Sequence, residues 1–208
     1  NPDPAPVLQH LLDQCHSSAS RSCEPSSSTH LTREELDRVE AFRRARETAV
    51  LVVVFTDMEC STAIQERLGE LEFSVLRKGL VRVSREIVER DGGGTCVKNT
   101  GDGILAVFAE PATAIRRALE LLEATPTATA HPSLPEGARL RIGMDMGAVA
   151  VEESGGIVDD VFGYRVNRAS RVMALMAGGH LGVTSDVHDN AAGFLPSDIL
   201  WLDHGKYA

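Results

Sequence analysis

The sequence has little of several features that mark specialised classes of protein. Only 4% of its 208 residues are aromatic, and no apolar run approaches the ~18 residues of a membrane span. The few cysteines form no CxxC pair, and their spacing matches neither a zinc site nor a dense disulfide framework. They are Cys15, Cys23, Cys60 and Cys96. We therefore expect free thiols in a soluble, cytoplasmic protein.

An excess of basic charge is also absent. The chain has 21 Lys and Arg against 30 Asp and Glu, a net charge of −9. Because nucleic-acid binding depends on phosphate neutralisation by cationic side chains, we expect no nucleic-acid partner. The start, Asn1-Pro2-Asp3-Pro4, lacks the basic and apolar regions of a signal peptide, so we expect no membrane attachment in this segment.

Three regions differ in composition. Residues 1–31 are rich in Pro and Ser, which predicts a tail or linker. Residues 32–48 begin with a capping-box pattern and continue with apolar residues spaced three apart, which predicts an N-terminal helix. Two interpretations of this helix stay open: it packs on its own domain, or it transmits a signal or forms a dimer contact. Residues 49–208 make up the predicted catalytic domain.

The pattern of the third region alternates between strands and helices. The run Val50–Phe55 is β-branched and unbroken, typical of a strand that is buried on both faces. The order βααβ-βαβ predicts an α+β, ferredoxin-like (split βαβ) sandwich with extra C-terminal strands. The expected helices are 61–69, 71–90, 111–124 and 164–177. The expected strands are 50–55, 95–99, 104–108, 139–147 with a second strand after it, 180–184 and 198–203. Loops are expected at 125–137 and, as an acidic loop, before 163.

Two carboxylates stand where strands of this fold meet. Asp57 follows the buried run, and Asp102 sits in a tight Asp-Gly turn between two strands. Either residue alone is more often structural than functional. Together they converge, because the first strand and the central hairpin of a ferredoxin-like sheet are neighbours. Paired carboxylates bind divalent cations, and two such ions can activate a hydroxyl for displacement at phosphorus.

Four motifs in order then resemble one family, the class III nucleotidyl cyclases. They are Phe55-Thr56-Asp57 with Ser61-Thr62, KNTGDG at 98–103, Arg141-Ile142-Gly143, and DVFGYRVNRASR at 160–171. The resemblance implies that Asp57, Asp102 and the carbonyl of Met58 bind two divalent cations, Mg²⁺ or Mn²⁺. It also implies a turn whose backbone N–H groups bind the triphosphate. That turn comprises Met58, Glu59, Cys60, Ser61 and Thr62. Cys60 is a departure, since glycine is usual there.

The remaining motif positions imply the substrate and the chemistry. Lys98 and Asp160 match the pair that selects adenine, through its N1 and its amino group. Asn167 and Arg171, four residues apart and so on one helical face, match the groups that orient the ribose and stabilise charge on the α-phosphoryl. Arg165 is expected to serve solvent. The resemblance thus implies an adenylate cyclase that makes 3′,5′-cyclic AMP and pyrophosphate from ATP in intracellular signalling.

In this family each site lies between two domains, one supplying the metal aspartates and the other the base pair and the Asn/Arg helix. Since this chain carries both sets of residues, the resemblance implies that two copies form a C₂ homodimer. Alternatives stay open: GTP, or a pyrimidine triphosphate as in antiviral members of the family, or a silent nucleotide-binding or dimerisation module. Asp145 stands where many members have His, which would place an extra carboxylate near the substrate pocket. The lysine that follows the final strand in many members has no match, because Lys206 comes too early.

Overall fold

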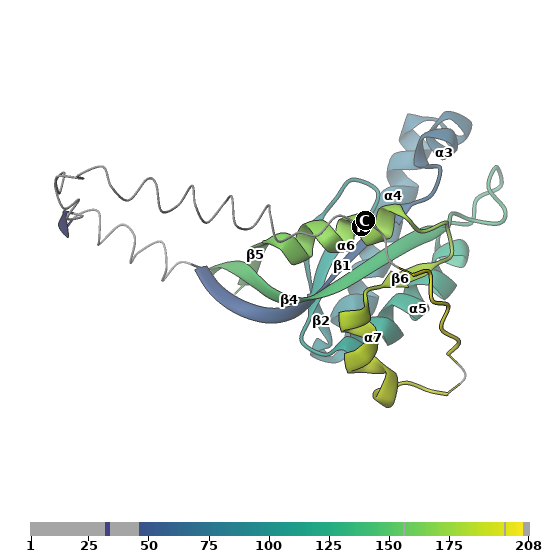
Figure 1. Ribbon diagram of the computed structural model, residues 1–208. Helices are drawn as coiled ribbons and strands as arrows, with labels where there is room; N and C mark the ends of the chain where they lie inside the picture. Colours follow the sequence, from purple (N-terminus) through teal and green to yellow (C-terminus); the bar gives the residue numbers. More distant parts are fainter. Residues whose placement is uncertain (1–31, 34–45, 156, 198, 206–208) are drawn as a thin grey trace, which may run out of the picture. The chain divides into compact units, whose positions relative to one another are not determined.

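The structure is a computed structural model that describes residues 32–33, 46–155, 157–197 and 199–205 (Figure 1). The chain divides into two compact units, Asn1–Ala41 and Phe42–Ala208. Of the first unit only Thr32 and Arg33 are described, so the predicted linker and most of the predicted N-terminal helix lie outside the described residues. Residues 46–48, predicted as the end of that helix, belong to the first strand of the second unit.

The second unit is built on one sheet whose strands run in the order β2-β3-β1-β4-β5. Its neighbours along this order are antiparallel, and β6 pairs in parallel with β4. This arrangement confirms the predicted ferredoxin-like fold. The strands are β1 (Arg46–Met58), β2 (Gly94–Asn99), β3 (Ile104–Phe108), β4 (Leu140–Ser154), β5 (Ile157–Phe162) and β6 (Leu181–Val183).

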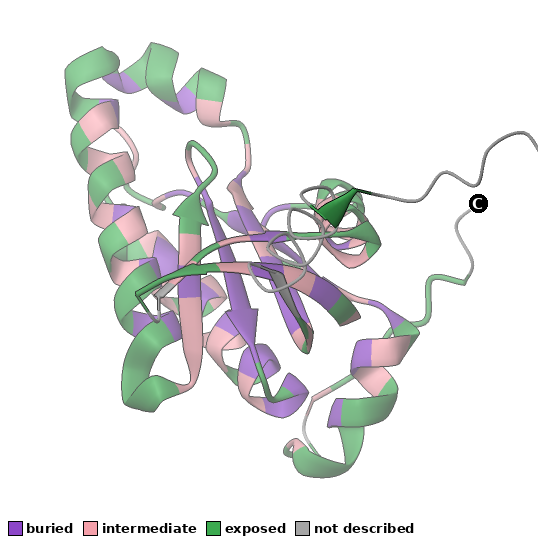
Figure 2. Cartoon of the chain, turned by 90° about the vertical axis from the view of Figure 1, so that its left-hand side faces the viewer, coloured by how far each residue is buried: buried purple, intermediate pink, exposed green. Residues whose placement is uncertain are grey.

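Helices cover the two faces of this sheet unequally (Figure 1). Val52 and Val54 of β1 point into the larger core, with α4, α5 and α7, while Val53 points into a smaller core with α6. Both faces of β1 are therefore covered, which explains its unbroken apolar run. Figure 2 shows the buried residues concentrated in the central strands and on the inward sides of the helices. The helices are α3 (Ser61–Leu68), α4 (Glu70–Glu89), α5 (Pro111–Ala128), α6 (Tyr164–Ala174) and α7 (Ser185–Ala191), with short 3₁₀ turns η2 (Arg90–Gly92) and η3 (Ala192–Phe194).

The sheet curls strongly. β2 and β5 stand at opposite ends of the strand order, yet Lys98 Nζ on β2 lies 2.6 and 2.7 Å from the carboxylate oxygens of Asp160 on β5. Register shifts interrupt β2 between Cys96 and Lys98 and β4 between Glu152 and Glu153. Such bulges bend a strand and increase its twist, which lets the two edges approach each other.

Several predicted boundaries were wrong. α5 continues to Ala128 through Pro126, because Thr125 and Thr129 each donate a hydroxyl hydrogen bond to the carbonyl four residues earlier. β4 runs unbroken through Gly147, since it pairs with β1 along the whole of that strand. The acidic segment before Gly163, predicted as a loop, is β5.

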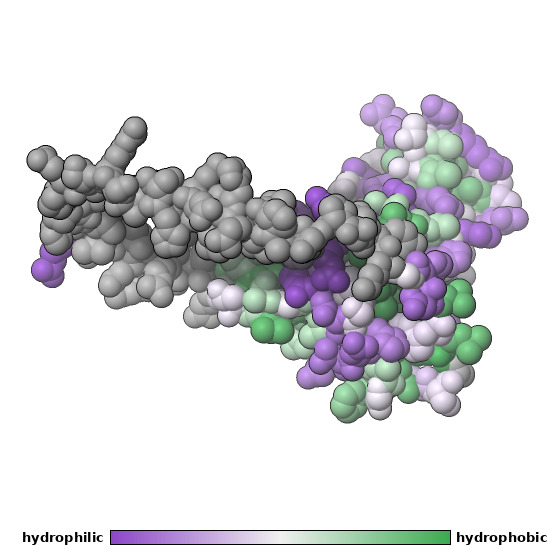
Figure 3. Space-filling model, in the orientation of Figure 1, coloured by the Kyte–Doolittle hydropathy of each residue, from purple (hydrophilic) through white to green (hydrophobic). Residues whose placement is uncertain are grey.

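The C-terminal part also differs from the prediction. A helix that was not predicted, α7, follows β6, and residues 199–203, predicted as a strand, form no regular element. Leu200 and Leu202 there are 88% and 80% exposed, so their apolar pattern does not reflect burial within the described residues. Apolar and polar side chains are interspersed on the face seen in Figure 3. None of the described helices has the length and apolar character needed to cross a membrane.

A glycine sets the distance between β4 and α6. A Cβ on Gly143 would lie 2.1 Å from the backbone nitrogen of Met173 and 2.6 Å from the carbonyl oxygen of Ala169. Both atoms are backbone, so neither can turn aside as a side-chain end could. The helix lies on the sheet at this spacing because Gly143 has no side chain.

We expect Gly143→Ala to lower the free energy of unfolding by about 1–3 kcal/mol, because α6 must move off the sheet. Gly79→Ala is the matched control: a Cβ there meets nothing within 4 Å, and it lies inside α4. That control should be neutral or stabilising by up to about 1 kcal/mol, as alanine favours the helix. Urea unfolding of both variants measures the difference, and equal stabilities would contradict the close packing.

Candidate active site

The structure brings the two predicted metal-binding carboxylates together at the end of β1. β1 pairs with β3 up to Phe55 and Leu105, so the turn that carries Asp102 lies beside Asp57. Thr56 fixes this turn, since its Oγ1 accepts a hydrogen bond of 2.9 Å from the Ile104 N–H. Gly103 packs against the same residue so closely that a Cβ would lie 1.8 Å from the Thr56 carbonyl oxygen. Backbone packing therefore holds the two aspartates side by side.

The electrostatics of the pair follow from this closeness. Burial raises the pKa of Asp57, and the negative charge of Asp102 raises it further, while a hydrogen bond from Arg141 acts in the opposite direction. Two carboxylates that disfavour each other's charge form a site that a cation would stabilise. Their oxygens, with the carbonyl of Met58, are the hard donors that Mg²⁺ and Mn²⁺ prefer. The residues present therefore fit the implied cations.

Arg141 is a site residue to which the sequence reasoning gave no role. Its Nε and Nη2 lie 2.8 and 2.5 Å from the same oxygen of Asp57, Oδ2. The two residues are direct partners in the β1–β4 register, with both side chains on one face of the sheet. The Arg141-Ile142-Gly143 motif already singles out this arginine, but only the strand register shows that its side chain contacts Asp57.

The predicted phosphate turn joins β1 to α3. Met58 is buried, and the Glu59 N–H donates to the Arg139 carbonyl at 2.9 Å. The Glu59 carboxylate accepts a hydrogen bond of 2.7 Å from the Gly178 N–H, so this side chain anchors the turn. The first helical hydrogen bond runs from the Ile64 N–H to the Cys60 carbonyl, which leaves the N–H groups at the start of α3 for an anion.

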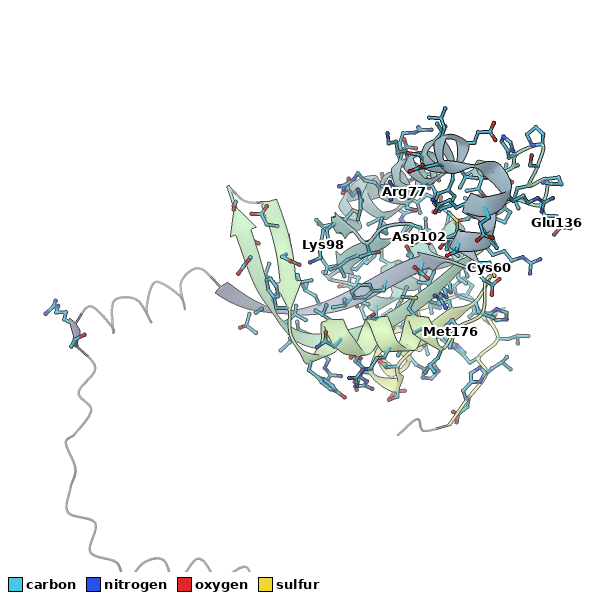
Figure 4. The ribbon with its side chains drawn as sticks, turned by 90° about the horizontal axis from the view of Figure 1, so that it is seen from above. Cys60, Arg77, Lys98, Asp102, Glu136 and Met176 are labelled. Atoms are coloured by element: carbon cyan, nitrogen blue, oxygen red, sulfur yellow. The ribbon has the colours of Figure 1, made fainter. Side chains whose placement is uncertain are left out.

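The predicted base-selecting pair lies on the curled edges of the sheet. Lys98 and Asp160 form a direct ion pair, with side chains 47% and 23% exposed. Asp160 Oδ1 also accepts a hydrogen bond of 2.8 Å from the Val161 N–H, which fixes the carboxylate. Figure 4 shows Asp102 and Cys60 toward one end of the sheet and Lys98 displaced from them toward the β4–β5 hairpin.

Asn167 and Arg171 lie on α6, as predicted, and both are exposed. Within the part of the chain that the structure describes, neither side chain has a hydrogen bond or an ion pair. α6 rests on the sheet through Ala169, its one buried residue. The helix therefore presents an amide and a guanidinium that are not used to hold this fold together.

Two expectations about neighbouring residues were wrong. Arg165, expected to serve solvent, has a side chain only 28% exposed and donates to Asp186 at 2.7 Å. Asp145, expected near the substrate pocket, is fully buried under α6, where it accepts a hydrogen bond of 2.8 Å from Thr184 Oγ1. The spacing of residues along one helix could not show these contacts, because Arg165 pairs with residues of β4 and of α7, a helix that was not predicted.

Comparisons with known proteins show the family to which the chain belongs. Residues 44–195 match the sequence model of the adenylate and guanylate cyclase catalytic domain. The chain belongs to this family. It is 35% identical over 116 residues to "Putative adenylate cyclase 3" of Rhizobium meliloti (strain 1021), a match over 55% of this chain. The match covers only 18% of that relative's length.

Solved structures of the family share the fold. The catalytic core of a rhodopsin-guanylyl cyclase with converted specificity, in complex with ATPalphaS, is 23% identical with a TM-score of 0.59, over 69% of this chain and 83% of that one. The guanylyl cyclase Cya2 is 20% identical with a TM-score of 0.62, over 71% and 80%. A bacterial light-regulated adenylyl cyclase is 18% identical with a TM-score of 0.66, over 99% and 61%.

Cys60 departs from the residue expected in the phosphate turn of such a cyclase domain. Its φ of 55° and ψ of 32° lie in the left-handed region, which glycine adopts without strain. The turn thus keeps the conformation that glycine favours while carrying a side chain. Cys60, which is exposed, and Cys96, which is buried, are both free thiols, as predicted; Cys15 and Cys23 lie outside the described residues.

We expect Cys60→Gly to raise the free energy of unfolding by up to about 1 kcal/mol, because relief of left-handed strain outweighs the larger entropy of an unfolded glycine. Cys60→Ala is the matched control, since it removes the thiol but keeps the Cβ that causes the strain. Chemical unfolding under reducing conditions measures both. Equal stabilisation by the two variants would point to the thiol and contradict the role of the backbone.

Proposed function

We propose that this domain is an adenylate cyclase, which converts ATP to 3′,5′-cyclic AMP and pyrophosphate at the interface of a homodimer. The observation that carries the proposal is the Lys98–Asp160 ion pair, on a chain that also sets two carboxylates side by side at the end of β1. The first feature suits a base with an acceptor beside a donor. The second suits the cations that accompany a triphosphate. Together they favour one nucleotide and one reaction.

The reaction proposed is attack of the ribose 3′-oxygen on the α-phosphorus, with pyrophosphate as the leaving group. Asp57, Asp102 and the Met58 carbonyl would hold the divalent cations, which when bound lower the pKa of the 3′-hydroxyl and bind phosphate oxygens. The N–H groups at the start of α3 bind triphosphate oxygens. Arg171 stabilises the charge that develops on the α-phosphoryl group, and Asn167 orients the ribose.

The base proposal follows from donors and acceptors. Lys98 donates to an acceptor such as adenine N1, and Asp160 accepts from the neighbouring amino group. Guanine presents a donor at N1 and an acceptor at its 6-position, so each contact would be reversed. Cytosine presents the same order as adenine on a smaller ring. The pair therefore favours ATP over GTP by hydrogen bonding, and ATP over CTP only by the size of the base.

The dimer proposal rests on exposed groups. Asn167 and Arg171 have no partner among the described residues, although both belong to the motif that identifies the site. In a C₂ dimer, α6 and the Lys98–Asp160 pair of one chain would complete the site that contains Asp57 and Asp102 of the other. Two equivalent sites would then form, and a monomer would have no complete one.

Mass spectrometry of the products should identify cyclic AMP after incubation with ATP and Mn²⁺ or Mg²⁺, with GTP, CTP and UTP tested separately. Asp57→Ala should abolish the product, because a cation ligand is lost. Asp189→Ala, which removes a carboxylate whose side chain is 73% exposed on α7, is the matched control and should leave the product unchanged. A different cyclic nucleotide would overturn the base proposal, and no product with any nucleotide would favour the silent binding module.

A mixture of Asp57→Ala and Arg171→Ala chains should regain activity that neither has alone. Each heterodimer contains one intact site, and half of the dimers in an equal random mixture are heterodimers. The expected rate is therefore about one quarter of the wild-type rate. Activity against mixing ratio measures this, and no recovery at any ratio would contradict a site shared between chains.

A further inference from the structure

Four charged side chains form a closed ring that joins α6 to two other elements. Arg165 Nη1 lies 3.4 Å from Asp145 and 2.7 Å from Asp186. Arg168 completes the ring, with Nε 3.7 Å from Asp145 and Nη1 3.2 Å from Asp186. Each arginine thus meets both carboxylates, and the ring has no net charge. It ties α6, which carries both arginines, to β4 through Asp145 and to α7 through Asp186.

The residues around this ring give it a further hydrogen bond and the space it needs. Asp145 is fully buried and is also held by the Thr184 hydroxyl at 2.8 Å. Gly147 leaves room for Arg165, since a Cβ there would lie 2.5 Å from its Nε. The hydrogen bond from Arg165 lowers the pKa of Asp186, so its carboxylate stays charged in the ring. A buried carboxylate is costly without partners, and here all its partners come from α6 and from the residue that precedes α7.

Apart from the ring, α6 is held by apolar packing on the sheet, which includes Val166 against the smaller core. Ala169 is its one buried residue, and the close approach at Gly143 sets its distance from the sheet but not its rotation. The ring, in contrast, holds two side chains one turn apart near the start of the helix. Arg171 lies one turn beyond Arg168 and about 60° from it around the helix axis, and Asn167 is offset from Arg168 by about 100°. Any rotation that breaks the ring would also turn these two side chains.

We propose that Asp145 is a positioning residue, which through its ring with Arg165, Asp186 and Arg168 holds α6 so that Asn167 and Arg171 point into the reaction site. This inference rests on the proposed cyclase function for its consequence, but the positioning of α6 can be measured separately. The departure at Asp145 thus acts on the catalytic helix and not on the choice of base.

The first test uses Asp145→Asn, which keeps the size of the side chain and an acceptor for Thr184 but removes the charge. We expect kcat for cyclisation to fall at least tenfold, with KM for ATP changed less than threefold, since orientation at the reacting group is lost and binding of the nucleotide is not. Arg82→Gln is the matched control: it breaks an exposed ion pair with Glu86 on α4 and should leave both constants unchanged. A rise in KM at constant kcat would overturn the proposal.

Mixed dimers locate the defect. In a mixture of Asp145→Asn with Asp57→Ala, the intact site takes α6 from the chain with the unaltered ring, so it should turn over at the wild-type rate per site. In a mixture with Arg171→Ala, the site must use α6 of the Asp145→Asn chain, so it should remain at least tenfold slower. Equal rates in the two mixtures would indicate a general folding defect and overturn the proposal.

A second measurement does not depend on activity. Amide hydrogen exchange within α6, residues 164–174, should be at least tenfold faster in Asp145→Asn than in wild type, and unchanged in Arg82→Gln. Asp186→Asn opens the ring from its exposed side and should give the same result if Asp145→Asn fails to fold. Unchanged exchange in α6 would overturn the inference even if the enzyme is active. A wild-type chain that makes no cyclic nucleotide would instead refute the proposed function.

Discussion

The antiparallel pairing of β1 with β4 places almost every feature of the candidate site. Along this one register Asp57 faces Arg141, Phe55 faces Gly143 and Val53 faces Asp145. All six side-chain positions lie on the α6 face, since successive residues of a strand alternate between faces. A shift of one residue would bury the aspartate on the other face and remove the gap into which α6 packs. The buried apolar run of β1 prevents that shift, because its two faces fit two different cores.

Charge balance in the folded domain is local. The chain carries a net charge of −9, yet three of its buried or half-buried carboxylates each have a guanidinium or ammonium partner: Asp57 with Arg141, Asp160 with Lys98, and Asp145 with Arg165. These ion pairs differ in whether the charges around the carboxylate balance. The ring around Asp145 joins two carboxylates to two guanidinium groups, so its charges balance without a further cation. Asp57 has a second carboxylate beside it, so its balance is incomplete without a further cation.

The sequence predicted what depends on local pattern. The central strand, the tight turn at Asp102 and most helices followed from periodicity, and Asp57 and Asp102 could be expected to converge once the topology was assigned. Lys98 and Asp160 could be linked only through the family resemblance, because their contact depends on the curl of the whole sheet. Arg165 was misjudged, and Asp145 misplaced, because their partners lie on distant elements, one of them not predicted. The apolar residues near Leu200 were misjudged for a related reason, since alternation does not show what a segment packs against.

The same central register has a consequence for how the chain folds. Partners in the β1–β4 ladder are separated by 82 to 106 residues, whereas those of the β2–β3 hairpin are close in sequence. Closing such long loops costs chain entropy before any strand contact forms to offset it. We therefore expect the middle of the sheet to assemble late and slowly. During synthesis the apolar run of β1 leaves the ribosome long before β4 does. Until β4 arrives, that strand is an exposed segment of high β-propensity, which makes it the part of this domain most prone to aggregate.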